Sequence, residues 1–189
     1  LRKSLKVYYE AKNLFEKSDF NTSLFVSEYP NHIKDYVSKI EKNRFDRIIV
    51  FGGDGSINEV VNGLNDSNNL QSFKIGVIPT GSGNSVAHDT GLLDVKDAIS
   101  KSLGDNTIKI DLNQVDFDSF SRLSVSVLGW GMFSYGNIRA EKLRLIGPIR
   151  YDLASIITLL EKKIHKAEVE VDGKLKLLEC AFIVACNSK

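Results

Sequence analysis

The sequence predicts an α/β protein: a parallel-sheet domain followed by part of an antiparallel β-sandwich domain. Three observations support this class. Short apolar runs and amphipathic helical patterns alternate over the first 106 residues, which is typical of crossover connections in a parallel sheet. The pattern then changes to alternating apolar and polar residues, which indicates half-buried antiparallel strands. An Asp-Gly pair at 172–173 separates two such runs and predicts a tight hairpin.

In the first half, apolar residues that recur every three or four positions predict helices, each with one apolar stripe. Short β-branched apolar runs between them predict buried strands. The expected helices cover 5–17, 30–42, 56–64 and 94–103, with a short helix after a loop that starts at residue 79. The expected strands cover 21–26, 47–51 and 73–78.

The second half is expected to contain antiparallel strands and one helix. Alternating or apolar runs predict strands at 107–115, 122–128 and 181–185, and the run 167–177 predicts two strands on either side of its Asp-Gly pair. Residues 148–162 predict the helix, because Pro148 suits a first helical turn and apolar residues follow at helical spacing. The change of pattern predicts an α/β domain over 1–106 and a partial β-sandwich domain over 107–189.

The composition is that of an ordinary globular protein, with 42% hydrophobic and 26% charged residues. A net charge of +1 gives no general attraction to nucleic acid, so we expect no nucleic-acid partner. No apolar run approaches the roughly 20 residues that a membrane-spanning helix needs. Two cysteines and three histidines lack disulfide or metal-ligand spacing, so we expect free, buried thiols in a reducing compartment and no metal-ligand cluster.

The stretch GGDGS at 52–56 lies between a predicted buried strand and a predicted helix. Open α/β sheets bind ligands at this end of their strands. Glycines let a phosphate approach the backbone, and the helix N-terminus offers free N–H groups and partial positive charge. Asp54 would repel phosphate unless it binds Mg²⁺ or takes a proton from an attacking hydroxyl. The alternative is that Asp54 only caps the helix.

A second loop, PTGSGNS at 79–85, also follows a predicted strand and precedes a helix. Two such loops at adjacent strand ends favour a nucleotide site over two unrelated turns. Neither loop has the GxxxxGK pattern of a P-loop or the G-x-G-x-x-G pattern of a dinucleotide site. A basic stretch in the second half would neutralise phosphate or form a solvated surface. It consists of Arg139, Lys142, Arg144 and Arg150.

Two strings, GGDGSINEVVNGL and IGVIPTGSGNSVAHDTGL, resemble the two signatures of the diacylglycerol kinase catalytic domain family. That family includes sphingosine and ceramide kinases and bacterial lipid kinases. The string SVSVLGWGMFSYGNIRAEKLRLIGPIRYDL resembles the start of the second domain in the sphingosine and ceramide kinase branch. The resemblance covers most of the chain. NAD kinases share a GGDG loop but not the NEVVNGL continuation.

The resemblance implies a lipid kinase that uses ATP and Mg²⁺. It would transfer the γ-phosphoryl group to a primary hydroxyl of a sphingoid, ceramide or diacylglycerol lipid. Asp54 matches the general base of the family. Other matching positions imply two phosphate loops, a glutamate near the ribose, a serine near the adenine and two arginines on phosphate. These positions are Gly52, Gly53, Gly55, Gly81, Ser82, Gly83, Asn84, Glu59, Ser27, Arg144 and Arg150.

The sequence departs from the family pattern at three places. It has no counterpart of the family's first strand with its Asn-Pro-x-x-Gly loop, and none of the later Asp-Gly-Glu motif. We therefore expect a fragment that lacks both ends. Sphingosine kinases carry aspartates, one of which binds the sphingosine amine, where this chain has Tyr135 and Asn137. This neutral pair favours ceramide, diacylglycerol or another neutral acceptor.

Two alternatives remain open from sequence. One is a kinase of a soluble acceptor in the NAD kinase style, and the other is a non-catalytic nucleotide-binding module. For a lipid kinase we expect a cytoplasmic protein in peripheral contact with a membrane surface.

Overall fold

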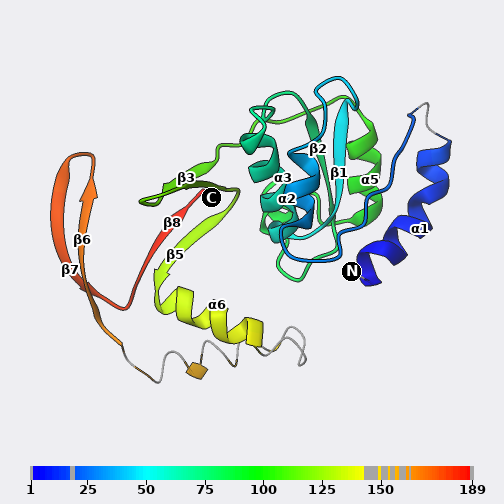
Figure 1. Cartoon of the computed structure of the whole chain (residues 1–189). Helices are drawn as coiled ribbons and strands as arrows, with labels where there is room; N and C mark the ends of the chain where they lie inside the picture. The colour runs from blue at the N-terminus through cyan, green and yellow to red at the C-terminus, as the bar shows by residue number, and fades with distance from the viewer. Residues whose placement is uncertain are drawn as a thin grey trace. The chain divides into compact units, whose positions relative to one another are not determined.

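The structure is a computed structural model that describes residues 2–17, 20–142, 149, 153, 156–157, 161 and 163–187. The chain divides into two compact units, Leu1–Ser126 with Asn187–Lys189 and Val127–Cys186. Figure 1 shows the elements in chain order. The predicted class is confirmed, because one strand pair is parallel and the others are antiparallel.

The first unit is built around a parallel pair of strands. β1 (Arg47–Gly52) and β2 (Lys74–Pro79) lie side by side over their whole lengths (Figure 1). The connection between them passes through a helix, as parallel neighbours require. The helices of this unit are α1 (Arg2–Glu16), α2 (His32–Val37), α3 (Asp54–Asp66), α4 (Ser85–Asp89) and α5 (Val95–Leu103).

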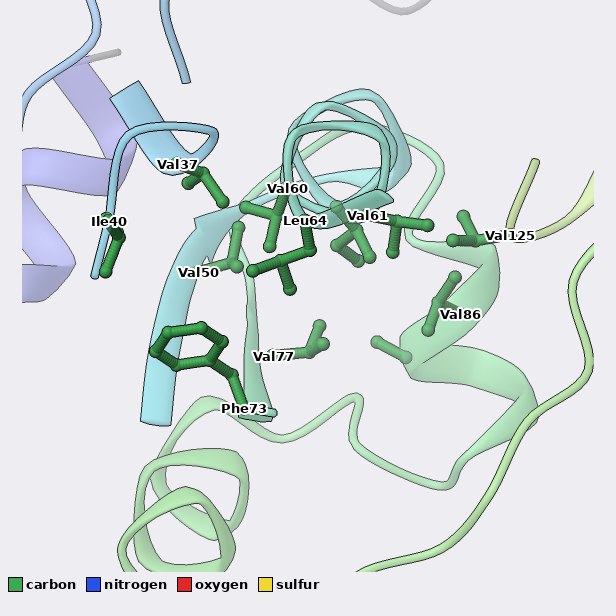
Figure 2. Packing of buried hydrophobic residues seen from close by; sticks show 12 residues of the cluster. Val37, Ile40, Val50, Val60, Val61, Leu64, Phe73, Val77, Val86 and Val125 are labelled. Carbon is green, nitrogen blue, oxygen red and sulfur yellow. The ribbon is translucent and has the colours of Figure 1, made fainter. Parts of the chain in front are cut away.

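Apolar clusters on the two faces of the strand pair hold the helices in place, because successive strand residues point to opposite faces. On one face, Val50 of β1 packs with Val60 and Leu64 of α3 (Figure 2). On the other face, Ile78 of β2 packs with Phe15 of α1 and with α5. Leu64 and Ile78 are fully buried, and each such side chain stabilises the fold by about 1.5–3 kcal/mol. The helices are thereby fixed relative to the ends of the strands.

An antiparallel hairpin completes the first unit. It consists of β3 (Asn113–Asp116) and β4 (Ser121–Ser124). The buried side chain of Asn62 on α3 accepts a hydrogen bond from the Leu123 N–H at 3.0 Å and donates one to the Leu123 carbonyl at 2.9 Å. The hairpin is therefore bound to the helix that starts at Asp54.

The second unit contains two antiparallel pairs and a helix. β5 (Val127–Gly131) pairs with β8 (Phe182–Cys186), and β6 (His165–Val171) pairs with β7 (Lys174–Cys180). Asp172 and Gly173 between β6 and β7 have φ values of 50° and 73°, so the predicted tight Asp-Gly turn is confirmed. Helix α6 (Met132–Lys142) follows β5. Cys180 and Cys186 are free as predicted, but neither is buried as expected: Cys180 is half-buried and Cys186 is exposed.

Several element predictions differ from the structure. Residues 20–28 contain no helix or strand, although a strand was expected at 21–26. Residues 107–112 also contain no strand, and a break at 125–126 splits the run expected at 122–128 into β4 and β5. The pattern gave no indication of α6, which has a glycine at its centre. The helix expected at 148–162 falls largely outside the described residues, and the domain boundary near residue 106 stays a prediction.

Among the described residues, no helix combines the length and the apolar character needed to span a bilayer.

Candidate active site at the two glycine loops

The first glycine loop connects β1 directly to α3. β1 ends at Gly52, Gly53 is the N-cap residue with extended backbone, and Asp54 is the first residue of the helix. A Cβ added at Gly52 would lie 2.6 Å from the Cβ of Ser56. Glycine is therefore required at position 52 for this close approach. The turn places Asp54 at the positive end of a 13-residue helix.

Both carboxylate oxygens of Asp54 bind the backbone that follows the second glycine loop. Oδ2 accepts a hydrogen bond from the N–H of Ser85 at 3.0 Å, and Oδ1 accepts one from the N–H of Val86 at 3.0 Å. These N–H groups belong to the first turn of α4 and have no partner within the helix. Each oxygen can accept one further bond, because a carboxylate has about four lone-pair positions. Asp54 thus joins the two loops and retains capacity for a ligand.

Asn84 closes the second loop. Its backbone is left-handed, with φ 58° and ψ 42°, a conformation that asparagine tolerates better than most residues. Its Oδ1 accepts from the Gly81 N–H at 2.9 Å, and its Nδ2 donates to the Gly81 carbonyl at 3.0 Å. One side chain therefore satisfies both backbone groups of Gly81 and holds residues 81–84 as a compact loop.

The two loops touch through their glycines. A Cβ built at Gly81 would lie 2.5 Å from the Cα of Gly53, and a Cβ built at Gly53 would lie 3.0 Å from the Cα of Gly81. The N–H of Thr80 also donates to the Gly52 carbonyl at 3.0 Å. The sequence predicted two loops at adjacent strand ends, and the structure brings them into backbone contact.

The outer side of the loops is open. Gly55, Ser82 and Gly83 are exposed, and no atom lies within 4 Å of a Cβ built at Gly55. A ligand can therefore reach the first turn of α3 and the second loop from solvent.

Glu59 binds a helix terminus in this structure. Its Oε1 accepts from the N–H of Asn31 at 3.1 Å, and its Oε2 accepts from the N–H of Ile33 at 3.1 Å. Asn31 is the N-cap of α2 and makes no side-chain capping bond of its own. Glu59 therefore caps α2 from a neighbouring helix. Its expected contact with a ribose stays a prediction.

Ser27 lines a cavity of about 480 Å³ that also reaches Ser56 of α3. The cavity runs along an edge of β1, because Val50 and Phe51, which point to opposite faces of the strand, both line it. The structure thus brings Ser27 to the same cavity as the first turns of α3. Its expected place near an adenine stays a prediction.

The structure describes only part of the basic stretch. Arg144 and Arg150 lie outside the described residues, so their predicted phosphate contacts are untested. Arg139 forms an ion pair with Glu161 and donates a hydrogen bond to it. That bond, with the charge of Arg139 and of Lys163, holds the pKa of the Glu161 carboxyl below its usual value. Arg139 therefore has an acidic partner inside its own unit.

Tyr135 lies on α6 with its side chain exposed. The Lys163 ammonium is 5.2 Å from the centre of the Tyr135 ring, and the rings of Tyr135 and His165 lie 6.0 Å apart. The side chain of Asn137 is outside the described residues. At position 135 the described surroundings are thus aromatic and basic.

Sequence reasoning missed Asn58 and Asn62. Asn58 accepts a hydrogen bond from the Val125 N–H at 3.1 Å, and Asn62 binds Leu123 as described above. The available signal was their spacing, since residues four apart share one face of a helix.

The described residues contain no group of three or more His, Cys, Asp or Glu side chains that could hold a metal ion. Mg²⁺ usually needs fewer protein ligands, because it binds one or two carboxylates together with substrate phosphates. The free acceptor capacity of Asp54 fits that role.

Comparison with known proteins agrees with this geometry. Residues 2–115 match the diacylglycerol kinase catalytic domain. The chain is 31% identical over 185 residues to the ceramide kinase of Homo sapiens, covering 87% of this chain and 34% of that protein. It is 29% identical over 165 residues to the diacylglycerol kinase of Bacillus subtilis (strain 168), covering 85% of this chain and 52% of that protein. The chain thus spans about a third to a half of these relatives.

A crystal structure of a protein from Bacillus anthracis str. Sterne matches with a TM-score of 0.65 at 23% identity, covering 86% of this chain and 54% of that chain. This likeness concerns the fold. Since the family match covers more than half of the sequence, the chain belongs to the diacylglycerol kinase catalytic domain family.

Proposed function

We propose that this chain is the catalytic core of an ATP-dependent lipid kinase. It transfers the γ-phosphoryl group of ATP to a primary hydroxyl of a sphingoid, ceramide or diacylglycerol lipid. The observation that carries the proposal is the contact between the glycine loops, which Asp54 joins through Ser85 and Val86. Membership of the family and the names of the ceramide, sphingosine and diacylglycerol kinases among the relatives support it.

The geometry of the two loops supports the following proposed roles. Phosphates of ATP bind the exposed backbone of Gly55, Ser82 and Gly83, where the N-terminus of α3 offers positive potential. Asp54 takes the proton of the attacking lipid hydroxyl, using the acceptor capacity that its two backbone bonds leave free. Mg²⁺, which Asp54 would help to hold, neutralises charge on the phosphates when it is bound.

The remaining contacts are proposals from the family resemblance. Ser27 lies near the adenine, Glu59 near the ribose, and Arg144 and Arg150 bind phosphates. The β-sandwich domain expected over 107–189 holds the lipid. A neutral acceptor is favoured, because Tyr135 and Asn137 stand where sphingosine kinases carry aspartates, one of which binds the sphingosine amine. We further propose a cytoplasmic location with peripheral contact to a membrane surface.

The test is Asp54→Asn in the complete protein. A general base contributes about 10²–10⁴-fold to rate, so lipid phosphorylation should fall by at least a factor of about 100. Asparagine keeps one oxygen for the α4 backbone but presents an NH₂ group to the other N–H, which should cost about 0.5–2 kcal/mol of stability. The rate is therefore measured at saturating ATP and well below the thermal midpoint of the variant. Asp94→Asn is the matched control, since Asp94 caps α5 through the Asp97 N–H at 2.9 Å and takes no part in the proposed chemistry.

Lipid phosphorylation near the wild-type rate in Asp54→Asn would disprove the role of Asp54. The same assay with labelled ATP should include NAD beside the three lipid classes. Labelled NADP with no lipid product would show a kinase of a soluble acceptor. ATP binding without any product would show a non-catalytic module.

A further inference from the structure

The turn that joins β3 to β4 carries two exposed phenylalanines. Phe117 and Phe120 are 52% and 51% exposed, although phenylalanine is among the residues most often buried in folded proteins. Their rings stack on each other, with centroids 4.5 Å apart and an angle of 23° between the planes. We name Phe117 and Phe120 the aromatic patch. The end of the hairpin therefore presents one compact apolar surface to solvent.

The aromatic patch is held in a defined shape. The N–H of Phe117 donates to the Phe120 carbonyl at 2.8 Å, which continues the β3–β4 ladder by one further residue pair. The backbone of Leu123 on β4 is bound by Asn62, which attaches the hairpin to α3. The two rings are therefore already ordered, and little freedom is lost when they bind a partner.

The two faces of the hairpin differ in character near its end. Directly opposed residues of an antiparallel pair point to the same face, and successive residues alternate between faces. The register pairs Val115 with Arg122 and Asp116 with Ser121. One face therefore carries the aromatic patch together with Val115 and Arg122, and the opposite face is polar.

Charged groups stand directly behind the aromatic patch. The Arg122 guanidinium lies 5.7 Å from the centre of the Phe120 ring. On the polar face, hydrogen bonds from Ser121 and Gln114 hold the pKa of the Asp116 carboxyl below its usual value, so this group stays charged. The end of the hairpin is thus amphipathic, with apolar rings at the turn and a cation suited to a phosphate group beside them.

We propose that the β3–β4 turn inserts the aromatic patch into the surface of a phospholipid bilayer, with Arg122 beside the headgroup phosphates. Amphipathic elements bind a bilayer in this way, with rings at the boundary of the acyl chains and cations among the headgroups. The inference rests on the proposed function, since it names the element that brings the kinase to a lipid held in a membrane. Both strands lie within residues 107–189, the region expected to hold the lipid.

The charges of the turn specify the kind of bilayer. Residues 115–122 contain two carboxylates, Asp116 and Asp118, and one guanidinium, Arg122, which gives a net charge of −1. Burial of the aromatic patch, and no general attraction to anionic lipid, therefore supplies the binding. Zwitterionic phosphatidylcholine should suffice, and high salt should weaken the binding little.

The first test measures vesicle binding, which needs no activity. The complete protein is sedimented with phosphatidylcholine vesicles beside a variant that combines Phe117→Ser with Phe120→Ser. The partition coefficient should fall at least about ten-fold in this variant, because binding scales with the apolar area that enters the bilayer. Leu14→Ser combined with Leu93→Ser is the matched control, since these side chains are 51% and 55% exposed. The control should bind vesicles as the wild type does.

The second test locates the turn within the bilayer. Phe120→Trp keeps an aromatic ring and adds a fluorophore at the patch. Vesicles with brominated acyl chains should quench this added fluorescence, because tryptophan at a membrane interface lies close to the acyl chains. A tryptophan at the control position, Leu93→Trp, should not be quenched. This measurement decides the proposal even if the serine variant does not fold.

The third test separates docking from chemistry. The kcat/KM of the double serine variant should fall about ten-fold on lipid held in vesicles, in step with binding. On a short-chain lipid dissolved as monomers it should stay near the wild-type value, because the turn does not touch the reacting groups. An equal loss on both substrates would overturn the proposal.

Equal vesicle binding by the wild type and the double serine variant would also overturn it, as would an unquenched Phe120→Trp or an equal loss of binding in the leucine control. A wild type that binds vesicles through the patch but phosphorylates neither lipid would refute the proposed function and support the docking surface.

Discussion

The carboxylate of Asp54 accepts a hydrogen bond at 3.0 Å from the backbone N–H of Val86, thirty-two residues further along the chain. The other oxygen binds Ser85 in the same way. Charge-assisted bonds of this kind are stronger than neutral ones. The residue expected to serve as the general base therefore also fixes the loop expected to bind nucleotide. The effect of a substitution at Asp54 should therefore be measured both on proton transfer and on the structure of the second glycine loop.

Gly81→Ala tests the contact between the two loops. The new Cβ would lie 2.5 Å from the Gly53 Cα, so the backbones must separate. We expect a loss of about 1–3 kcal/mol of stability in urea denaturation and weaker ATP binding. Gly55→Ala is the control, because its Cβ meets no atom within 4 Å and alanine favours the helix by about 0.5–1 kcal/mol. Equal destabilisation by both substitutions would contradict the contact.

Glu59→Gln separates helix capping from nucleotide binding. Glutamine keeps one acceptor oxygen but presents an NH₂ group to one of the two N–H groups at Asn31 and Ile33. Loss of a capping bond should cost about 0.5–2 kcal/mol in denaturation. If Glu59 also binds the ribose, the KM for ATP should rise several-fold. Destabilisation with an unchanged KM would leave Glu59 as a cap only, and exposed Glu41→Gln should change neither quantity.

Asn62→Leu tests the attachment of the β3–β4 hairpin to α3. Leucine fills a similar volume but leaves the N–H and the carbonyl of Leu123 without their partner. Each unpaired buried group costs about 1–3 kcal/mol, so the denaturation midpoint should fall clearly. A midpoint equal to that of Asn65→Leu, at an exposed position on the same helix, would show that the amide of Asn62 contributes nothing.

Asp105→Asn tests an ion cluster at the start of the strand pair. Asp105 accepts from Lys74 at 3.0 Å and from Arg47 at 3.3 Å, and these cations hold its pKa below the ordinary value of 3.8. A lowered folded-state pKa means that the stabilisation is present above the unfolded-state pKa and is lost as pH falls through the folded-state pKa. The wild type should therefore exceed Asp105→Asn in stability at pH 7, and the difference should vanish in acid.

High salt should also reduce this difference, because Asp105 is exposed and its charge is screened. Asp118→Asn, in the turn between β3 and β4, is the control. A difference that persists unchanged at pH 2 would show that charge at Asp105 is not its cause.

The parts of the fold that sequence predicts well are those decided locally. β1 and β2 are short apolar runs, and the β6–β7 hairpin depends on a turn that Asp172 and Gly173 specify by themselves. Residues 21–26 have the composition of a strand. A strand also needs a neighbouring strand to pair with, and the local sequence does not specify that partner. Helix α6 was missed because Gly136 interrupts a weak apolar period.

The candidate site likewise has features that the local sequence predicts and features that depend on distant residues. Glycines after a buried strand are a local signal, so both loops could be found from sequence. The partners of Asp54, Asn58, Glu59 and Asn62 lie roughly 26–67 residues away along the chain, and only the folded structure brings them together.

The cavity beside β1 has a practical consequence for concentrated solutions of this chain. Among the described residues, only β2 pairs with β1, and the other edge of β1 faces the apolar walls of the 480 Å³ cavity. Residues 20–27 line the same cavity, so they shield this edge from a strand of another molecule. Self-association of the 189-residue chain by strand addition at Arg47–Gly52 should therefore be disfavoured.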